Sequence, residues 1–66
     1  MDKLFTKGQK VKCNYTGNKG EIVEYLCDTR DLPPSERDQV IVRFYATCRG
    51  SSAYNSQRSQ FNLKAI

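Results

Sequence analysis

Basic and aromatic side chains occur in this sequence at positions where they could bind a polyanion. Lys10 and Lys12 alternate with apolar residues in one short run, Lys19 follows in the next turn, and Arg43 and Tyr45 alternate in the run QVIVRFYA. Lysine and arginine neutralise phosphates, while an exposed tyrosine ring can stack on a base. The pattern therefore predicts binding of RNA or DNA. The residues expected to contact nucleic acid or another partner are Lys10, Lys12, Lys19, Tyr25, Arg43, Tyr45, Arg49 and Arg58.

The same charges also have a simpler explanation. Eleven basic residues against seven acidic ones leave a formal net charge of +4. Lysine and arginine on strands keep a small β protein soluble and protect its edges from pairing with other chains. The overall charge permits an anionic partner without requiring one. The positions of the cations matter more than their number.

Catalysis and metal binding lack their usual residues. The chain has no histidine, and its cysteines, at positions 13, 27 and 48, form no CxxC pair. A structural zinc site draws four ligands from closely spaced Cys and His, and a cysteine nucleophile normally has a histidine partner. No spacing of carboxylates suggests an acid-base pair. We expect no enzyme activity, cofactor, metal or small-molecule substrate, and reduced cysteines, with a strained disulfide or a redox role as the alternative.

Length and composition bound the architecture. The 66 residues, 38% of them hydrophobic, suit one domain, residues 1–66, with one small core. No apolar run approaches the roughly 20 residues needed to span a bilayer. The early apolar pair Leu4-Phe5 is followed closely by Lys7 and Lys10, so no signal peptide is indicated. We expect a cytoplasmic protein without membrane contact, monomeric or weakly self-associating.

The stretch 8–26 has the pattern of a β-hairpin. Two β-like runs, 9–15 and 21–27, flank a turn that contains Gly17 and Gly20. Glycine tolerates the backbone angles that tight turns need. This hairpin is the expected founding element of the fold.

Alternation of apolar and polar residues predicts which face each side chain occupies. In the second run of the hairpin, Ile22 and Val23 are adjacent, which predicts a bent strand with Val23 and Tyr25 on the outer face. Leu4 and Phe5 are expected to cover an open end of the sheet. The expected core consists of Val11, Cys13, Ile22, Leu26, Val40, Val42, Phe44, Leu63 and Ile66.

The rest of the chain predicts a polar loop and three more strands. The segment 28–38 carries Pro33-Pro34 and indicates a loop with room for one helical turn. Strands are expected at 39–46, which should be central, at 52–58, which is polar and suits an edge, and at 64–66. A tight helical turn over 59–63, anchored by Phe61 and Leu63, should precede the last strand.

Five short strands in about 60 residues predict an all-β fold, a single SH3-like small barrel with a short 3₁₀ turn before the last strand. The run Gly8-Gln-Lys-Val11, followed by Gly17 and Gly20-Glu-Ile-Val, resembles the opening of KOW-type domains. The tail 61–66 is similar to the 3₁₀ turn and terminal strand that close such barrels. The resemblance implies contact with RNA, ribosomes or transcription complexes.

A protein-interaction module or inhibitor is the alternative function. A free-standing domain of this size is typical of mobile-element and bacteriophage proteins that dock on a larger host protein. Val23, Tyr25, Ile41 and Tyr45 would form an apolar aromatic patch with Arg43 as a charged anchor. Tyrosine and arginine are enriched at binding hot spots. A groove for proline-rich peptides is not expected, because the chain has no tryptophan and no ALYDY-like run.

A weaker similarity points toward an enzyme family. The run 20–27 resembles a strand of the plasmid-borne type II dihydrofolate reductases, which are SH3-like barrels that assemble around a central pore. In that family a Val-Gln-Ile-Tyr segment lines the pore and binds the ligands. The corresponding position here is Ser52-Ala53-Tyr54-Asn55. The binding motif is not reproduced, and the activity is not expected.

Overall fold

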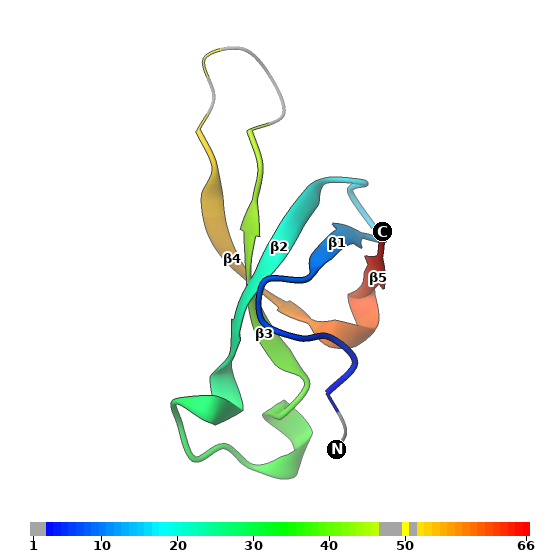
Figure 1. Cartoon of the computed structure of the whole chain (residues 1–66). Coiled ribbons are helices and arrows are strands. Elements are labelled where there is room, and N and C mark those ends of the chain that lie inside the picture. Colours follow the sequence, from blue (N-terminus) through cyan, green and yellow to red (C-terminus); the bar gives the residue numbers. More distant parts are fainter. Residues whose placement is uncertain (1–2, 47–49, 51) are drawn as a thin grey trace.

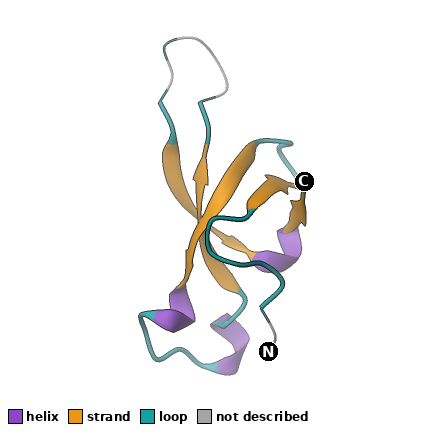
Figure 2. Ribbon diagram, viewed as in Figure 1, coloured by secondary structure: helices purple, strands orange, loops and turns teal. Residues whose placement is uncertain are grey.

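In the part of the chain that the structure describes, the fold is built from five strands and three short 3₁₀ turns (Figures 1 and 2). A computed structural model describes residues 3–46, 50 and 52–66. Arg49 and Cys48 lie outside the described residues. The elements in chain order are β1 (Lys10–Cys13), β2 (Lys19–Tyr25), η1 (Leu26–Asp28), η2 (Pro34–Glu36), β3 (Gln39–Phe44), β4 (Tyr54–Ser59), η3 (Gln60–Asn62) and β5 (Leu63–Ala65).

The strands form one antiparallel sheet in the order β4-β3-β2-β1-β5. The hairpin of β1 and β2 forms as expected, β3 and β4 extend it on one side, and β5 returns to pair with β1 on the other. The 3₁₀ turn η3 leads directly into β5. The prediction of an all-β fold of five strands, with a short 3₁₀ turn before the last one, is therefore confirmed. The sheet is open, because β4 and β5 are at opposite ends of the strand order (Figure 1).

The core lies on the inner face of this bent sheet. The buried hydrophobic residues are Phe5, Val11, Cys13, Ile22, Tyr25, Leu26, Val40, Val42, Phe44 and Leu63. Eight of the nine expected core residues are in this set, and Ile66 is not, with 59% of its surface exposed. The Ile66 N–H donates to the Lys10 carbonyl, so alternation from Leu63 puts Ile66 on the outer face with Lys10. Phe5 covers the core as expected, while Leu4 is 54% exposed.

A β-bulge in β2 reverses the predicted orientation of Tyr25. The pairing register with β3 shifts between Ile22 and Glu24, so Val23 is an extra residue in the strand. An extra residue turns the following side chains to the opposite face. Tyr25 consequently points into the core and is only 3% exposed. The prediction that Tyr25 is on the outer face is wrong.

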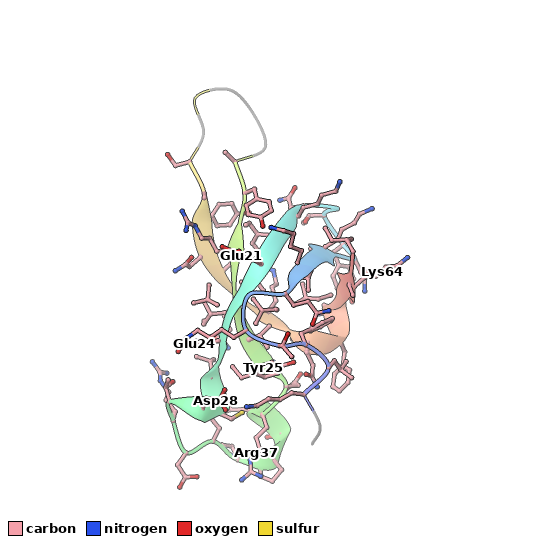
Figure 3. The ribbon with its side chains drawn as sticks, in the orientation of Figure 1. Glu21, Glu24, Tyr25, Asp28, Arg37 and Lys64 are labelled. Atoms are coloured by element: carbon pink, nitrogen blue, oxygen red, sulfur yellow. The ribbon has the colours of Figure 1, made fainter. Side chains whose placement is uncertain are left out.

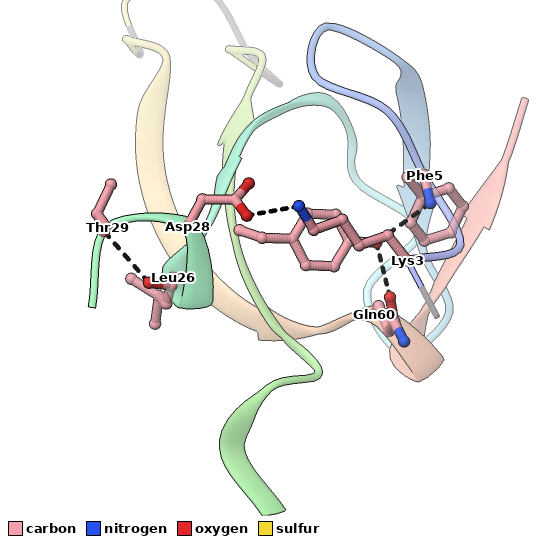
Figure 4. A network of polar contacts seen from close by, with 7 residues as sticks. Lys3, Phe5, Leu26, Asp28, Thr29 and Gln60 are labelled. Atoms are coloured by element: carbon pink, nitrogen blue, oxygen red, sulfur yellow. Dashed lines mark hydrogen bonds and ion pairs between the residues drawn. The ribbon is translucent and has the colours of Figure 1, made fainter. Parts of the chain in front are cut away.

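The Tyr25 hydroxyl joins the N-terminal segment to η3 through hydrogen bonds with Phe5 and Gln60, both of which are labelled in Figure 4. It donates to Gln60 Oε1 at 2.6 Å and accepts from the Phe5 N–H at 3.1 Å. The Leu4 N–H donates to the same Gln60 oxygen at 3.1 Å. Gln60 is 1% exposed, whereas the expected anchor Phe61 is 57% exposed. A buried polar network, rather than Phe61, therefore holds this end of the barrel.

Replacing Tyr25→Phe should lower the free energy of unfolding by about 2 kcal/mol, because the buried Phe5 N–H loses its acceptor and Gln60 loses a donor. Urea unfolding followed by circular dichroism would measure the loss. Tyr54→Phe is a matched control, since the Tyr54 hydroxyl accepts only a long 3.5 Å bond from the exposed Asn18 amide. Equal losses in the two variants would contradict a structural role for the Tyr25 hydroxyl.

Gly20 allows β2 and β3 to approach closely. It is buried and is the direct partner of Phe44 in the ladder. A Cβ atom at this position would be 2.5 Å from the Arg43 carbonyl oxygen and 3.0 Å from the Phe44 Cα. The glycine is required by the space between the two main chains, not by a turn.

Candidate nucleic-acid interface

Three lysines from three strands are neighbours on the outer face of the sheet. Lys12 on β1 is directly opposite Lys19 on β2 and Lys64 on β5. All three side chains are exposed, and Figure 3 shows Lys64 at the β5 edge. Adjacent strands are about 4.8 Å apart, so the row spans about 10 Å. We call Lys64, Lys12 and Lys19 the lysine row.

The lysine row is electrostatically unfavourable in the isolated protein. Like charges directly opposite each other on paired strands destabilise the sheet. Among the described residues, the only ion pair is between Lys3 and Asp28, so no carboxylate forms an ion pair with the row. A bound anion would relieve the repulsion. The row is therefore the strongest indication of an anionic partner on this surface.

A second row beside the first has mixed charge. The paired positions Lys10, Glu21, Arg43 and Asn55 run across β1, β2, β3 and β4. Directly paired residues share one face of a sheet, so this row lies on the same outer face as the lysine row. Glu21 is paired with Lys10 on one side and with Arg43 on the other, so it lies between the two cations. This row is closer to charge balance than the lysine row.

Tyr45 connects the two rows. Its N–H donates to the Lys19 carbonyl at 2.9 Å, which places it beyond Lys19 at the end of the lysine row. Lys10 Nζ donates to the Tyr45 hydroxyl at 3.1 Å and is 5.5 Å from the centroid of the ring. This hydrogen bond raises the pKa of Lys10 above its ordinary value. The ring is half-buried, and its hydroxyl is held by the Lys10 ammonium.

The structure brings together five of the eight residues expected to bind a partner. Lys10, Lys12, Lys19, Arg43 and Tyr45 share the outer face. Lys64 joins them and was not among the predicted residues. Alternation from Leu63 predicts that Lys64 points outward, but only the pairing of β5 with β1 brings it next to Lys12.

The other three predicted residues are not part of this surface. Tyr25 is in the core, and Arg49 lies outside the described residues. Arg58 is opposite Val40 on the inner face, where its guanidinium packs 5.5 Å from the Phe44 ring and donates to the Gln57 carbonyl. Its expected position along the outer basic surface is wrong, because the polar strand β4 gives no periodic signal of which side faces the core.

The apolar patch expected for a protein partner is smaller than predicted. Tyr25 is buried in the core and is not on this surface, and Val23 and Ile41 are half-buried. Glu24 is the direct ladder partner of Ile41, so a carboxylate interrupts the patch. Figure 3 shows Glu24 along β2 beyond Glu21. The outer face is better suited to an anion than to an apolar surface.

A hollow on another side of the molecule has mixed charge. It has a volume of about 560 Å³ and lies between the N-terminal segment, β2 and η1. Lys3 crosses it, with its ammonium 5.4 Å from the Tyr25 ring centroid and ion-paired with Asp28 (Figure 4). The hydrogen bond to Asp28 raises the pKa of Lys3. Because Lys3 and Asp28 already pair across this hollow, it is a poor site for a polyanion.

The thiols and acidic residues form no recognisable reactive centre. Cys13 and Cys27 are free thiols, the first buried and the second half-buried. Burial raises the pKa of the Cys13 thiol, but hydrogen bonds with Thr16, the Tyr15 main chain and Arg58 together outweigh this and lower it overall. The part of the chain that the structure describes contains no group of three or more Cys, Asp or Glu that could hold a metal ion. It also contains no helix with the length and apolar character needed to cross a membrane.

Comparison with known proteins adds no relative. No protein-family model matches the sequence, and searches of the curated proteins and of the solved structures find no match either. The arrangement of side chains on the outer face is therefore the main indication of what this protein binds.

Proposed function

We propose that this protein is a small basic module that binds nucleic acid through the outer face of its barrel. The lysine row holds backbone phosphates, Arg43 and Lys10 add charge beside it, and the Tyr45 ring contacts a base. The observation that carries the proposal is the pairing of Lys12 with Lys19 and Lys64 without a carboxylate in an ion pair. The resemblance of the glycine-containing hairpin to KOW-type domains supports the same class of ligand.

A binding role also suits the chemistry of the chain. Lysine side chains are flexible point charges, so a row of them follows a phosphate backbone without demanding one geometry. Binding neutralises phosphates and releases counterions, which makes affinity depend on salt. We propose a non-enzymatic, cytoplasmic protein that acts as a monomer or a weak oligomer.

A salt titration tests the proposal. Fluorescence anisotropy with labelled RNA and DNA oligonucleotides would give the association constant between about 25 mM and about 200 mM salt. For three to four phosphate contacts, the logarithm of this constant should fall against the logarithm of salt with a slope of about −2 to −3. Failure to bind any oligonucleotide at the lowest salt would overturn the proposal.

The second candidate function is an interaction module or inhibitor that docks on a larger protein. The half-buried pair Val23 and Ile41, next to Arg43, favours it. Retention of one specific host protein after nuclease treatment, lost on Ile41→Asp, together with no oligonucleotide binding, would favour this candidate over nucleic acid.

A further inference from the structure

A hollow opens beside Tyr45 at the end of the lysine row. Its volume is about 330 Å³, within the size range of small-molecule sites. Lys19 belongs to both this hollow and the lysine row, so a ligand could occupy the hollow while its charged groups lie along the row. The residues that line it are Gly17, Asn18, Lys19, Tyr45 and Ala46.

The aromatic wall of this hollow is held in position before any ligand binds. The Tyr45 hydroxyl is bonded to Lys10 Nζ, and the Tyr45 N–H is bonded to the Lys19 carbonyl. A ring that is already ordered loses little conformational freedom when a planar group stacks on it. The Tyr45 ring is therefore preorganised for a planar group to stack on it.

The lining of the hollow also includes Asn18, a side-chain amide on a turn that is held by main-chain hydrogen bonds. The Asn18 carbonyl accepts from the Cys13 N–H at 2.9 Å, and the Asn18 N–H donates to Thr16 Oγ1 at 3.2 Å. Gly17 has the positive φ of 76° that this turn requires. Among the residues that the structure describes, the Asn18 amide makes a single long bond of 3.5 Å, to the Tyr54 hydroxyl, which a better partner can replace. An amide presents both a donor and an acceptor, the pattern needed to pair with the edge of a base.

We propose that this hollow binds one unpaired nucleobase. The base stacks on Tyr45, its edge bonds to the Asn18 amide, and the adjoining phosphates lie on Lys19 and Lys12. A base inside a duplex has both faces covered by its neighbours, so the ligand class is single-stranded nucleic acid. This inference rests on the proposed function and specifies its ligand.

The test compares three probes of equal length at one salt concentration: a single strand, a duplex, and an abasic single strand that has the same phosphates without bases. The single strand should bind about 10-fold more tightly than the abasic strand, as expected for one stacked base. Tyr45→Leu should bring the ratio of the two affinities close to one. Tyr15→Leu is the matched control, because Tyr15 is 80% exposed and lies outside both rows, and it should keep the ratio.

A second variant tests the Asn18 amide, and it keeps the inference testable if Tyr45→Leu does not fold. Asn18→Ala should reduce the differences in affinity among four homopolymeric single strands, and thermal unfolding would verify that each variant is folded. Equal binding of the single strand, duplex and abasic strand by the unchanged protein would overturn this inference and the proposed contact of Tyr45 with a base, and it would leave standing the proposed binding of phosphates by the lysine row. No binding of any of the three at low salt would overturn both.

Discussion

Gly20→Ala is expected to lower the free energy of unfolding by about 3 kcal/mol, the upper part of the range for overpacking a core. A barrel of this size has a total stability of only about 3 to 5 kcal/mol, so a large fraction of the variant should be unfolded at room temperature. The added methyl group would lie 2.5 Å from the Arg43 carbonyl oxygen. That neighbour is main chain within the ladder, and it cannot rotate away as a side chain could.

Urea unfolding of Gly20→Ala and Gly8→Ala side by side would measure this effect. Gly8 has a φ of 86°, and a Cβ there would meet nothing within 4 Å. Its replacement should cost only about 1 kcal/mol from backbone strain. If Gly20→Ala proves no more harmful than Gly8→Ala, the close approach of β2 and β3 is not what makes Gly20 necessary.

The double replacement Lys12→Gln and Lys19→Gln should weaken nucleic-acid binding and stabilise the fold. Each lost phosphate contact lowers affinity about 5-fold at 0.1 M salt, so the pair should lower it about 25-fold and make the salt slope shallower by about 1.4. Lys12 is directly opposite both Lys19 and Lys64, and removing these like-charge pairs should raise stability by about 0.5 kcal/mol. A variant that binds nucleic acid more weakly but is more stable to unfolding would indicate that the lysine row serves binding at a cost in stability.

Anisotropy titrations and urea unfolding of the same double variant would check both effects. Arg30→Gln with Arg37→Gln is the matched control, because it removes the same charge from two exposed residues near η1 and η2. Figure 3 shows Arg37 at the η2 end of the molecule, away from Lys64. An equal loss of affinity in the control would mean that net charge, rather than the lysine row, determines binding.

Alternation along single strands predicted much of the fold correctly. Val11 and Cys13 point inward while Lys10 and Lys12 point outward, and Val40, Val42 and Phe44 are buried as expected. These assignments depend only on neighbours in sequence, since successive side chains on a strand point to opposite faces. The first hairpin and the 3₁₀ turn before the last strand follow from similarly local signals.

Predictions from the sequence were wrong where an inserted residue changed the strand register, and where a polar residue is buried in place of an apolar one. The bulge at Val23 sent Tyr25 inward. In η3, Gln60 rather than Phe61 is buried, because the Gln60 amide oxygen completes a hydrogen-bond network with the Tyr25 hydroxyl and the Leu4 N–H. A hydrophobicity pattern cannot predict a buried glutamine whose partners come from distant segments.

The sequence by itself determined that strand β1 has a basic outer face and that the chain is all-β. Only the tertiary structure decided that Lys64 and Lys19 would flank Lys12, and that Tyr45 would stand at the end of their row. The physical reason is the register between strands, which depends on core packing and on hydrogen bonds between remote segments. Local periodicity sets the direction of each lysine, whereas strand pairing makes the lysines neighbours.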